Sequence, residues 1–418
     1  MKHISLFLLF LLFLHPLKAQ NAAQNSFKTA MDTMLKHPEN YLAPVKAISG
    51  IKTDSTDFNS LNTWLQAMMT YYSFLGDYQQ VLFYSDNRFK DQINTQKVEY
   101  DTTFVKEHTF VNADAYITWQ ASRQQVIMIN EAHHLPFHRA FVLPMLEQFY
   151  KAGYRYLAIE TLEDSLINQK KYPDFSTGYY TNEPLFGEMI REAMRLHFKL
   201  INYEATEPCN VKTNDPYYCS RFRDSIMAVK LAGILKSDPK AKLLVYAGYD
   251  HIHEGSETSW KKMAQFFKEF TGIDPYTVEL TRQVEHLYPQ LNHKEFAAVN
   301  KFKHITKPVI ALKDNTPWHG EFVDATVIFP QYLVKGKRPS YNSIDGLRKF
   351  YSLDSLHLKI GQFVQAFYDN EKPGYRIPAD QLVISDSENC LYLFEGKYSL
   401  EIKNGEGALI KKDIINIK

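Results

Sequence analysis

Hydrophobic and polar positions divide the chain into three parts with different periodicities. Residues 21–110 place apolar side chains at steps of three and four, which predicts an amphipathic helical N-terminal subdomain. Residues 111–285 alternate short apolar runs with longer helical patterns. Residues 286–418 contain strand-like runs separated by Gly, Asn and Pro, and the last forty residues predict a small antiparallel β domain. An alternative for part of this region is that it extends the central sheet.

The middle part predicts an α/β domain with a mostly parallel central sheet and helices on both faces. The expected strands are 126–129, 156–159, 199–203, 242–247 and 276–280. The expected helices between them are 137–152, 184–196, 217–235 and 257–270. Strands separated by helices of this length are typical of a parallel sheet that is covered on both sides.

Titratable side chains follow four of these strands. They are Glu131, His133 and His134 after the first strand, Glu160 after the second, Glu204 after the third, and Asp250, His251 and His253 after the fourth. Because the carboxyl ends of parallel strands meet at one edge of a sheet, we expect these groups to lie close together. Carboxylates and imidazoles serve in general acid–base catalysis, and they also suit a divalent metal. Arg223, early in a predicted helix, would bind a carboxylate or an anionic transition state if it faced them.

Each of these residues also has a purely structural interpretation. Histidines after strands are often hydrogen-bonded turn residues, and Glu204 could be a solvated loop acid. Asp224, near the start of a predicted helix, is interpreted as a group that favours the helix dipole. The chain contains no G-x-S-x-G, P-loop or G-x-G-x-x-G motif, which disfavours an ordinary serine hydrolase and nucleotide binding.

The first twenty residues predict a secretory signal peptide. Lys2 and His3 precede the uncharged apolar run 4–14, and Ala19 offers a small residue for cleavage. The run is short for a membrane span, and no cysteine follows it, so we expect an exported periplasmic or secreted protein without a stable membrane anchor. In an oxidising compartment, Cys209 and Cys219 form either a disulfide or two free thiols, and Cys390 is left over.

The balance of charges limits the kind of partner. Forty-eight Lys and Arg residues stand against forty-seven Asp and Glu, so the formal net charge is +1. This balance gives no reason to expect nucleic acid or an acidic membrane surface as a partner. The partner expected for the polar strand ends is a small-molecule substrate or ligand. No C-x-x-C pair occurs, which disfavours a thiolate zinc site.

Four short motifs, in this order, resemble those of the erythromycin-esterase-like, ChaN-like and TraB–TIKI superfamily over residues 125–285. The family's G-E-x-x-H, L-x-x-E, R-D-x-x-M-A and G-H motifs are similar to Asn130–His134, Leu157–Glu160, Arg223–Ala228 and Gly248–His251. The first motif puts Glu131 and His134 on the family positions. Asn130 and Asp250 stand where the family has glycine, and His133 and His253 are additional.

The resemblance implies an α/β fold and leaves three functions open. The preferred one is a metal-independent ester or lactone hydrolase, with His134 as the general base, Glu131 or Glu160 orienting it, and His251 stabilising the oxyanion or protonating the leaving group. The second is a metal-dependent peptidase or hydrolase with Glu131, His134, Glu160 and His251 as ligands. The third is a protein that binds haem or another small ligand without turnover.

Overall fold

The computed structural model describes residues 20–51, 57–255, 259–335 and 338–418. The predicted signal peptide, residues 1–20, lies outside this part except for Gln20, where the first helix begins. The helical prediction for the N-terminal part is confirmed by α1 (Gln20–Lys36), α2 (Leu42–Ser49), α3 (Phe58–Leu75), α4 (Tyr78–Asp86), the short 3-10 helix η1 (Asn87–Phe89), α5 (Lys90–Thr95) and α6 (Thr102–Glu107).

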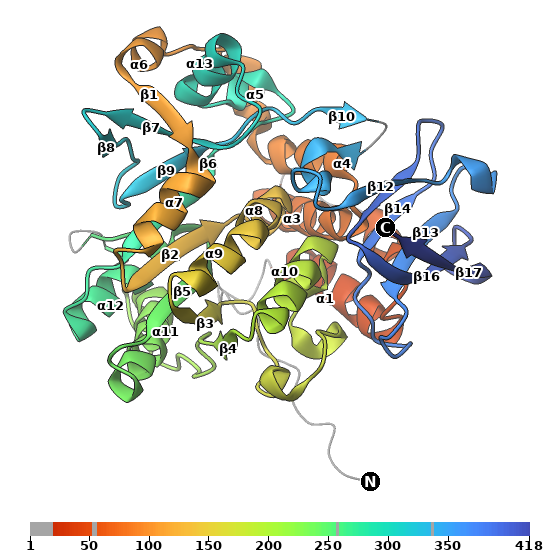
Figure 1. Cartoon of the computed structure of the whole chain (residues 1–418), viewed down its shortest axis with the longest axis horizontal. Coiled ribbons are helices and arrows are strands. Elements are labelled where there is room, and N and C mark those ends of the chain that lie inside the picture. The colour runs from red at the N-terminus through yellow and green to blue at the C-terminus, as the bar shows by residue number, and fades with distance from the viewer. Residues whose placement is uncertain (1–19, 52–56, 256–258, 336–337) are drawn as a thin grey trace.

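A large, mostly parallel sheet occupies the centre of the molecule (Figure 1). Its order is β1-β7-β9-β6-β2-β5-β3-β4, with β8 beside β7. The strands are β1 (Thr109–Asn112), β2 (Val126–Glu131), β3 (Tyr154–Ile159), β4 (Lys199–Asn202), β5 (Lys242–Gly248), β6 (Tyr276–Gln283), β7 (Val309–Lys313), β8 (Thr316–Pro317) and β9 (Ala325–Ile328). The strands from β9 to β4 pair in parallel, and the pairings made by β7 are antiparallel. Because β7, β8 and β9 belong to this sheet, it extends past the boundary expected at residue 285.

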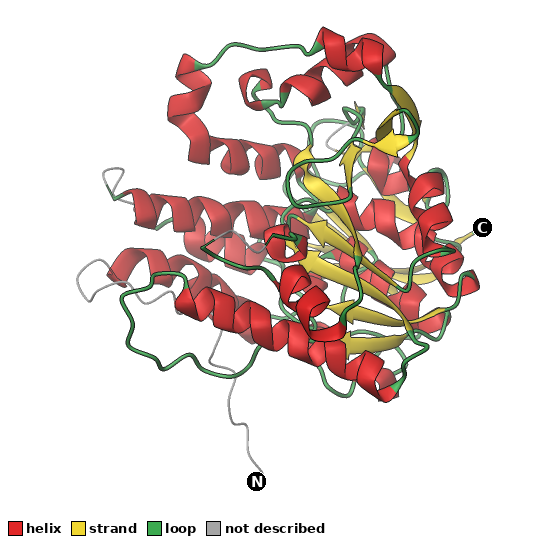
Figure 2. Cartoon of the chain, turned by 90° about the vertical axis from the view of Figure 1, so that its left-hand side faces the viewer, coloured by secondary structure: helices red, strands yellow, loops and turns green. Residues whose placement is uncertain are grey.

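Side chains of successive residues in β2 pack on opposite faces of the sheet. Ile127 and Ile129 belong to one buried core with α7 (Ala113–Ala121), α8 (Phe137–Val142), α9 (Leu146–Lys151) and α10 (Pro184–Arg195). Val126 and Met128 belong to a second core with α11 (Tyr218–Ser237) and α12 (Met263–Thr271). The first four residues of β2 are all apolar because helices cover both faces of the sheet, as predicted (Figure 2).

The C-terminal part is rich in antiparallel β-structure, as the sequence predicts. A four-stranded sheet has the order β14-β13-β16-β17, built from β13 (Phe363–Tyr368), β14 (Asp380–Val383), β16 (Gly396–Lys403) and β17 (Leu409–Ile417). This part also contains α13 (Lys294–Lys303), the pair β10 (Val334–Lys335) and β11 (Arg338–Pro339), the pair β12 (Lys349–Ser352) and β15 (Cys390–Leu393), and the 3-10 helices η7 (Pro289–Leu291), η8 (Ser340–Ser343) and η9 (Asp354–Leu356). None of the helices in the described ranges is long and apolar enough to cross a membrane.

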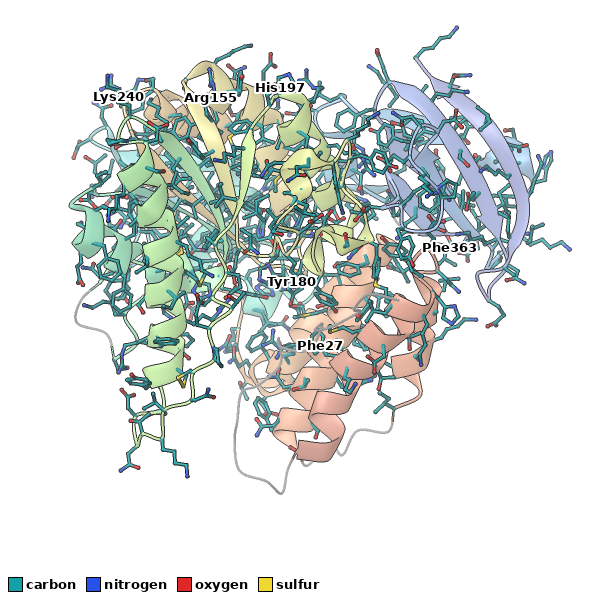
Figure 3. The ribbon with its side chains drawn as sticks, turned by 90° about the horizontal axis from the view of Figure 1, so that it is seen from below. Phe27, Arg155, Tyr180, His197, Lys240 and Phe363 are labelled. Atoms are coloured by element: carbon teal, nitrogen blue, oxygen red, sulfur yellow. A yellow bond between two sulfur atoms is a disulfide. The ribbon has the colours of Figure 1, made fainter. Side chains whose placement is uncertain are left out.

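The N-terminal helices lie beyond the carboxyl edge of the central sheet. Figure 3 shows Arg155, His197 and Lys240, near the starts of three strands, at the opposite end of the molecule from Phe27 of α1, with Tyr180 between. The helical part is therefore next to the strand ends at which the sequence places the candidate site.

Candidate functional site

Glu131, the last residue of β2, is buried in a network of hydrogen bonds. Nε and Nη2 of Arg139 donate to its two oxygens at 2.7 and 2.8 Å, and the Tyr246 hydroxyl donates at 2.8 Å. Burial opposes ionisation, but the charges of Arg139 and His133 hold the pKa of Glu131 far below its usual range. Glu131 is thus a fixed anion at the floor of the site.

His133 takes its orientation from Glu131 and an aromatic neighbour. Its Nδ1 lies 2.8 Å from Glu131 Oε1, and its ring stacks on Tyr180 with centroids 4.2 Å apart. With the Nδ1 proton donated to the carboxylate, Nε2 is left as an acceptor.

Gly248 separates His133 from Glu160 and leaves room for both. A Cβ added at Gly248 would lie 2.5 Å from His133 Nε2 and 3.0 Å from Glu160 Oε2. The two side chains line a hollow that is too tight for a water molecule in this conformation. The glycine is therefore required by the close approach of two functional groups, and the hollow must open before water can enter it.

Glu160, the first residue after β3, is the central carboxylate. The Gly248 N–H donates to Oε2 at 2.5 Å, and Nη2 of Arg223 donates to Oε1 at 2.6 Å. His251 Nε2 lies 3.6 Å from the same Oε1. Burial opposes ionisation, yet His251 and Arg223 lower the pKa of Glu160 to about 2. Glu160 is consequently ionised at neutral pH.

Arg223 of α11 joins two carboxylates to one histidine. Its Nε and Nη2 donate to the two oxygens of Glu204 at 2.7 and 2.5 Å, and Nη1 donates to His251 Nε2 at 2.7 Å. Burial raises the pKa of Glu204, although Arg223 opposes this. The Arg223 side chain is 31% exposed, against 7% for Glu160, so the cluster opens to solvent at the guanidinium.

His251 is oriented by Asp224, one residue after Arg223. Nδ1 of His251 lies 2.5 Å from Asp224 Oδ1, and Trp260 Nε1 donates to Asp224 Oδ2 at 2.7 Å. Because Arg223 donates to Nε2, the imidazole proton resides on Nδ1 and is donated to Asp224. Burial lowers the pKa of His251, but Asp224 and Glu160 raise it, and the net change is upward.

Two carboxylate–histidine pairs thus face one ionised carboxylate. Glu131 with His133 lies on one side of Glu160, and Asp224 with His251 lies on the other. A carboxylate on Nδ1 fixes the tautomer and stabilises the imidazolium that forms when Nε2 takes a proton. This arrangement is suited to proton transfer beside a fixed positive charge.

His134, the histidine preferred from the motif spacing, does not join this cluster. Its Nε2 lies 3.2 Å from Ser85 Oγ of α4, and its Nδ1 lies 3.3 Å from the Tyr249 hydroxyl. Burial and the nearby Arg88 hold the pKa of His134 well below its usual value. The side chain that meets Glu131 belongs to His133, because β2 continues through Glu131 and the chain turns immediately after it.

Two other strand-end residues also lie apart from Glu160. Asp250 pairs with Lys262 at 2.8 Å, and His253 Nε2 lies 3.2 Å from Glu279 at the adjacent strand β6. Glu204, in contrast, joins the cluster through Arg223. The strand ends therefore share one edge of the sheet, but only some of their side chains converge.

The four residues expected to bind a divalent metal do not form a ligand set. Glu131 faces Arg139, and Glu160 and His251 face Arg223. His134 contacts Ser85 and the Tyr249 hydroxyl instead. Within the described ranges, no group of three or more His, Cys, Asp or Glu side chains could hold a metal ion. Each carboxylate of the expected set already pairs with a guanidinium, Glu131 with Arg139 and Glu160 with Arg223.

Of the two alternatives for the paired cysteines, the structure has the disulfide. Cys209 and Cys219 are bonded, with Cα atoms 5.6 Å apart, and Cys390 is a buried free thiol. The bridge ties the loop after β4 to the first turn of α11, the helix that carries Arg223 and Asp224.

Sequence reasoning missed two charged residues of the site. Arg139 lies on α8, where all six residues are buried, and a lone arginine in such a helix is a signal for a buried carboxylate partner. Asp224 is fully buried in the second turn of α11, which begins at Tyr218, so its interpretation as a group at the helix start is wrong. Asp224 and His251 are 27 residues apart, so no local sequence pattern could have indicated their contact.

No protein-family profile and no curated protein sequence matches the chain. Among solved structures it is similar to the type III effector HopBA1 (11% identity, TM-score 0.30, covering 42% of this chain and 89% of that one). It is also similar to RRSP, a MARTX toxin effector domain from Vibrio vulnificus, with 13% identity and a TM-score of 0.28, over 57% of this chain and 50% of that one. A third similar structure is the C-terminal region of Pasteurella multocida toxin, with 10% identity and a TM-score of 0.31, over 91% of this chain and 58% of that one. The chain spans half the length of RRSP and 58% of the length of the Pasteurella multocida toxin region. At these TM-scores the likenesses assign no function, and membership of the erythromycin-esterase-like superfamily stays a prediction.

Proposed function

We propose that the protein is an exported, metal-independent hydrolase of esters or lactones, in the erythromycin-esterase-like superfamily. The observation that supports this is the pair of carboxylate-oriented histidines, His133 and His251, on either side of the ionised Glu160. The alternatives are less well supported, because both carboxylates of the expected metal set already pair with guanidinium groups and both ring nitrogens of His134 and His251 already have partners.

In the proposed reaction His133 is the general base. Its Nε2 takes a proton from water as the water oxygen attacks the carbonyl carbon, and Glu131 stabilises the resulting imidazolium. Glu160, on the other side of Gly248, accepts the second hydrogen bond from that water. The imidazolium then returns the proton to the leaving alkoxide, so that water and ester give an acid and an alcohol.

Arg223 has one hydrogen-bond donor left for the oxyanion. A guanidinium has five N–H groups. Four of those on Arg223 are used by Glu160, Glu204 and His251, which leaves the second N–H of Nη1. A fixed donor on a charged group is worth most where negative charge develops in the transition state. His251 Nε2 accepts the other N–H of Nη1 and so holds this donor in place.

A panel of aryl esters and lactones tests this proposal, with and without a chelator. We expect turnover that survives chelation and falls by about 10²-fold or more in Glu160→Gln. Glu192→Gln is the matched control, because Glu192 is also a carboxylate paired with an arginine but lies on the surface of α10. Loss of activity on chelation, or full activity in Glu160→Gln, would contradict the proposal.

A further inference from the structure

Arg88 is a half-buried cation with most of its donors unused. It lies in η1, and its Nε donates to Asn62 Oδ1 of α3 at 2.7 Å. Across the described ranges, no carboxylate pairs with its guanidinium, and both Nη groups lack an acceptor. Burial lowers the pKa of Arg88, as expected for a cation without an anion beside it. Four of its five N–H groups are therefore available to a ligand.

A chain of contacts places Arg88 on the helical side of the candidate site. Ser85, one turn earlier, contacts His134 Nε2 at 3.2 Å, and the other nitrogen of His134 contacts the Tyr249 hydroxyl. The Tyr249 ring lies 5.5 Å from that of His133, measured between centroids. Tyr249 is 41% exposed, so this group of contacts reaches solvent at Tyr249. The backbone of Tyr249 has a φ of 46°, a conformation uncommon outside glycine.

The two arginines near the site differ in how many of their N–H groups already have a hydrogen-bond acceptor. Arg223 donates to two carboxylates and a histidine, and it cannot bind a further anion by a two-pronged contact without losing one of them. Arg88 donates one hydrogen bond, from Nε to the neutral amide of Asn62, and this contact fixes the position of its side chain. A planar guanidinium with two free Nη groups matches a carboxylate or phosphate in a bidentate contact.

We propose that Arg88 binds an anionic group of the substrate, so that the hydrolase is specific for esters or lactones that carry a carboxylate or phosphate away from the scissile bond. This inference rests on the proposed function for the reaction itself, whereas the anion site stands on its own contacts. It also gives the N-terminal helices a role: the reacting groups lie on the sheet edge, and the specificity residue lies on the helical cover.

Binding of two amide probes tests the anion site without relying on turnover. Equilibrium dialysis of the full chain would compare N-phenylsuccinamate, which is anionic, with acetanilide, which is neutral. We expect the anionic probe to bind about tenfold more tightly to the wild type, as for one charge-assisted hydrogen-bonded contact. Arg88→Gln should abolish this preference, and Arg88→Lys should keep part of it, provided that both variants show the wild-type unfolding temperature.

Arg123→Gln is the matched control. Arg123 also lacks a carboxylate partner among the described residues and, like Arg88 over Phe89, lies over an aromatic ring, that of Trp119. It differs in position, because it precedes β2 at the opposite end of that strand from Glu131. This variant should keep the full preference for the anionic probe. An equal affinity of the wild type for both probes, or an unchanged preference in Arg88→Gln, would overturn the anion site.

A kinetic comparison separates this inference from the proposed function. In the wild type, 4-nitrophenyl hemisuccinate should be hydrolysed with a higher kcat/KM than 4-nitrophenyl acetate, and Arg88→Gln should reduce this ratio. If neither ester is hydrolysed but the dialysis preference depends on Arg88, the hydrolase proposal fails and the anion site stands. If both esters are hydrolysed equally well by the wild type and the variant, the hydrolase proposal stands and the anion site fails.

Discussion

Replacing Arg223 by glutamine should destabilise the protein strongly at neutral pH and only weakly in acid. The substitution removes the cation shared by Glu160 and Glu204, whose side chains are only 7% and 8% exposed. Removing one partner of a buried ion pair costs about 3–5 kcal/mol. Because the Arg223 side chain is 31% exposed, we expect a loss near the lower end, about 3 kcal/mol at pH 7.

The pH dependence follows from the two carboxylates. In the wild type the pKa of Glu160 is about 2, below its usual value of 4.5, so its stabilising contribution is complete above pH 4.5 and is lost as the pH falls toward 2. In Arg223→Gln the guanidinium no longer opposes burial, so the pKa of both carboxyls rises. Glu160 keeps His251, His133 and the Gly248 N–H beside it, whereas the pKa of Glu204, which burial already raises in the wild type, rises further. The variant then gains stability as the pH falls from 7 to 4.5, so the gap between the two proteins narrows.

Urea denaturation followed by tryptophan fluorescence at pH 7 and pH 4 measures this gap. Arg195→Gln is the control, because Arg195 pairs with Glu192 on the surface at 2.6 Å and its side chain is 63% exposed. That variant should stay within about 0.5 kcal/mol of the wild type at both pH values. A loss below about 1 kcal/mol for Arg223→Gln at pH 7, or a loss that is equally large at pH 4, would refute the electrostatic account.

Three further predictions concern the surroundings of the cluster. Asp224→Asn removes the anion that raises the pKa of His251, so the imidazole should titrate at lower pH in an NMR titration; an unchanged midpoint would contradict the assignment. Gly248→Ala places a methyl group 2.5 Å from His133 Nε2, so activity should fall about 10²-fold or more with near-wild-type urea stability, and full activity would exclude the close approach. Replacing both cysteines of the 209–219 disulfide by serine should lower the free energy of unfolding by about 2–3 kcal/mol, which the same urea assay checks against the wild type under oxidising and reducing conditions.

The central fold could be predicted because its strands and helices leave local patterns. Val126–Ile129 is apolar at every position, and the structure buries it from both faces. The pairing of β9 with β6 and with β7 could not be predicted from the sequence, because it depends on contacts between distant residues. The boundary expected at residue 285 therefore falls inside one continuous sheet.

The candidate site could be predicted to the level of the strand ends but not to the level of individual contacts. Parallel topology brings Glu131, Glu160 and Glu204 to one edge, as expected. Which histidine turns toward Glu131 depends on the residue at which β2 ends, and a one-residue change reverses the direction of a side chain. The motif spacing favoured His134, whereas the geometry favours His133.

Comparison of His133→Gln with His134→Gln tests the account most directly. Steady-state kcat/KM at pH 7, on an ester that the wild type hydrolyses, should fall by about 10²–10⁴-fold in His133→Gln, because the general base is lost. In His134→Gln it should fall by less than about tenfold, since that ring contacts Ser85 and Tyr249 and not Glu160. The reverse order, with His134→Gln inactive and His133→Gln active, would contradict the assignment of the base.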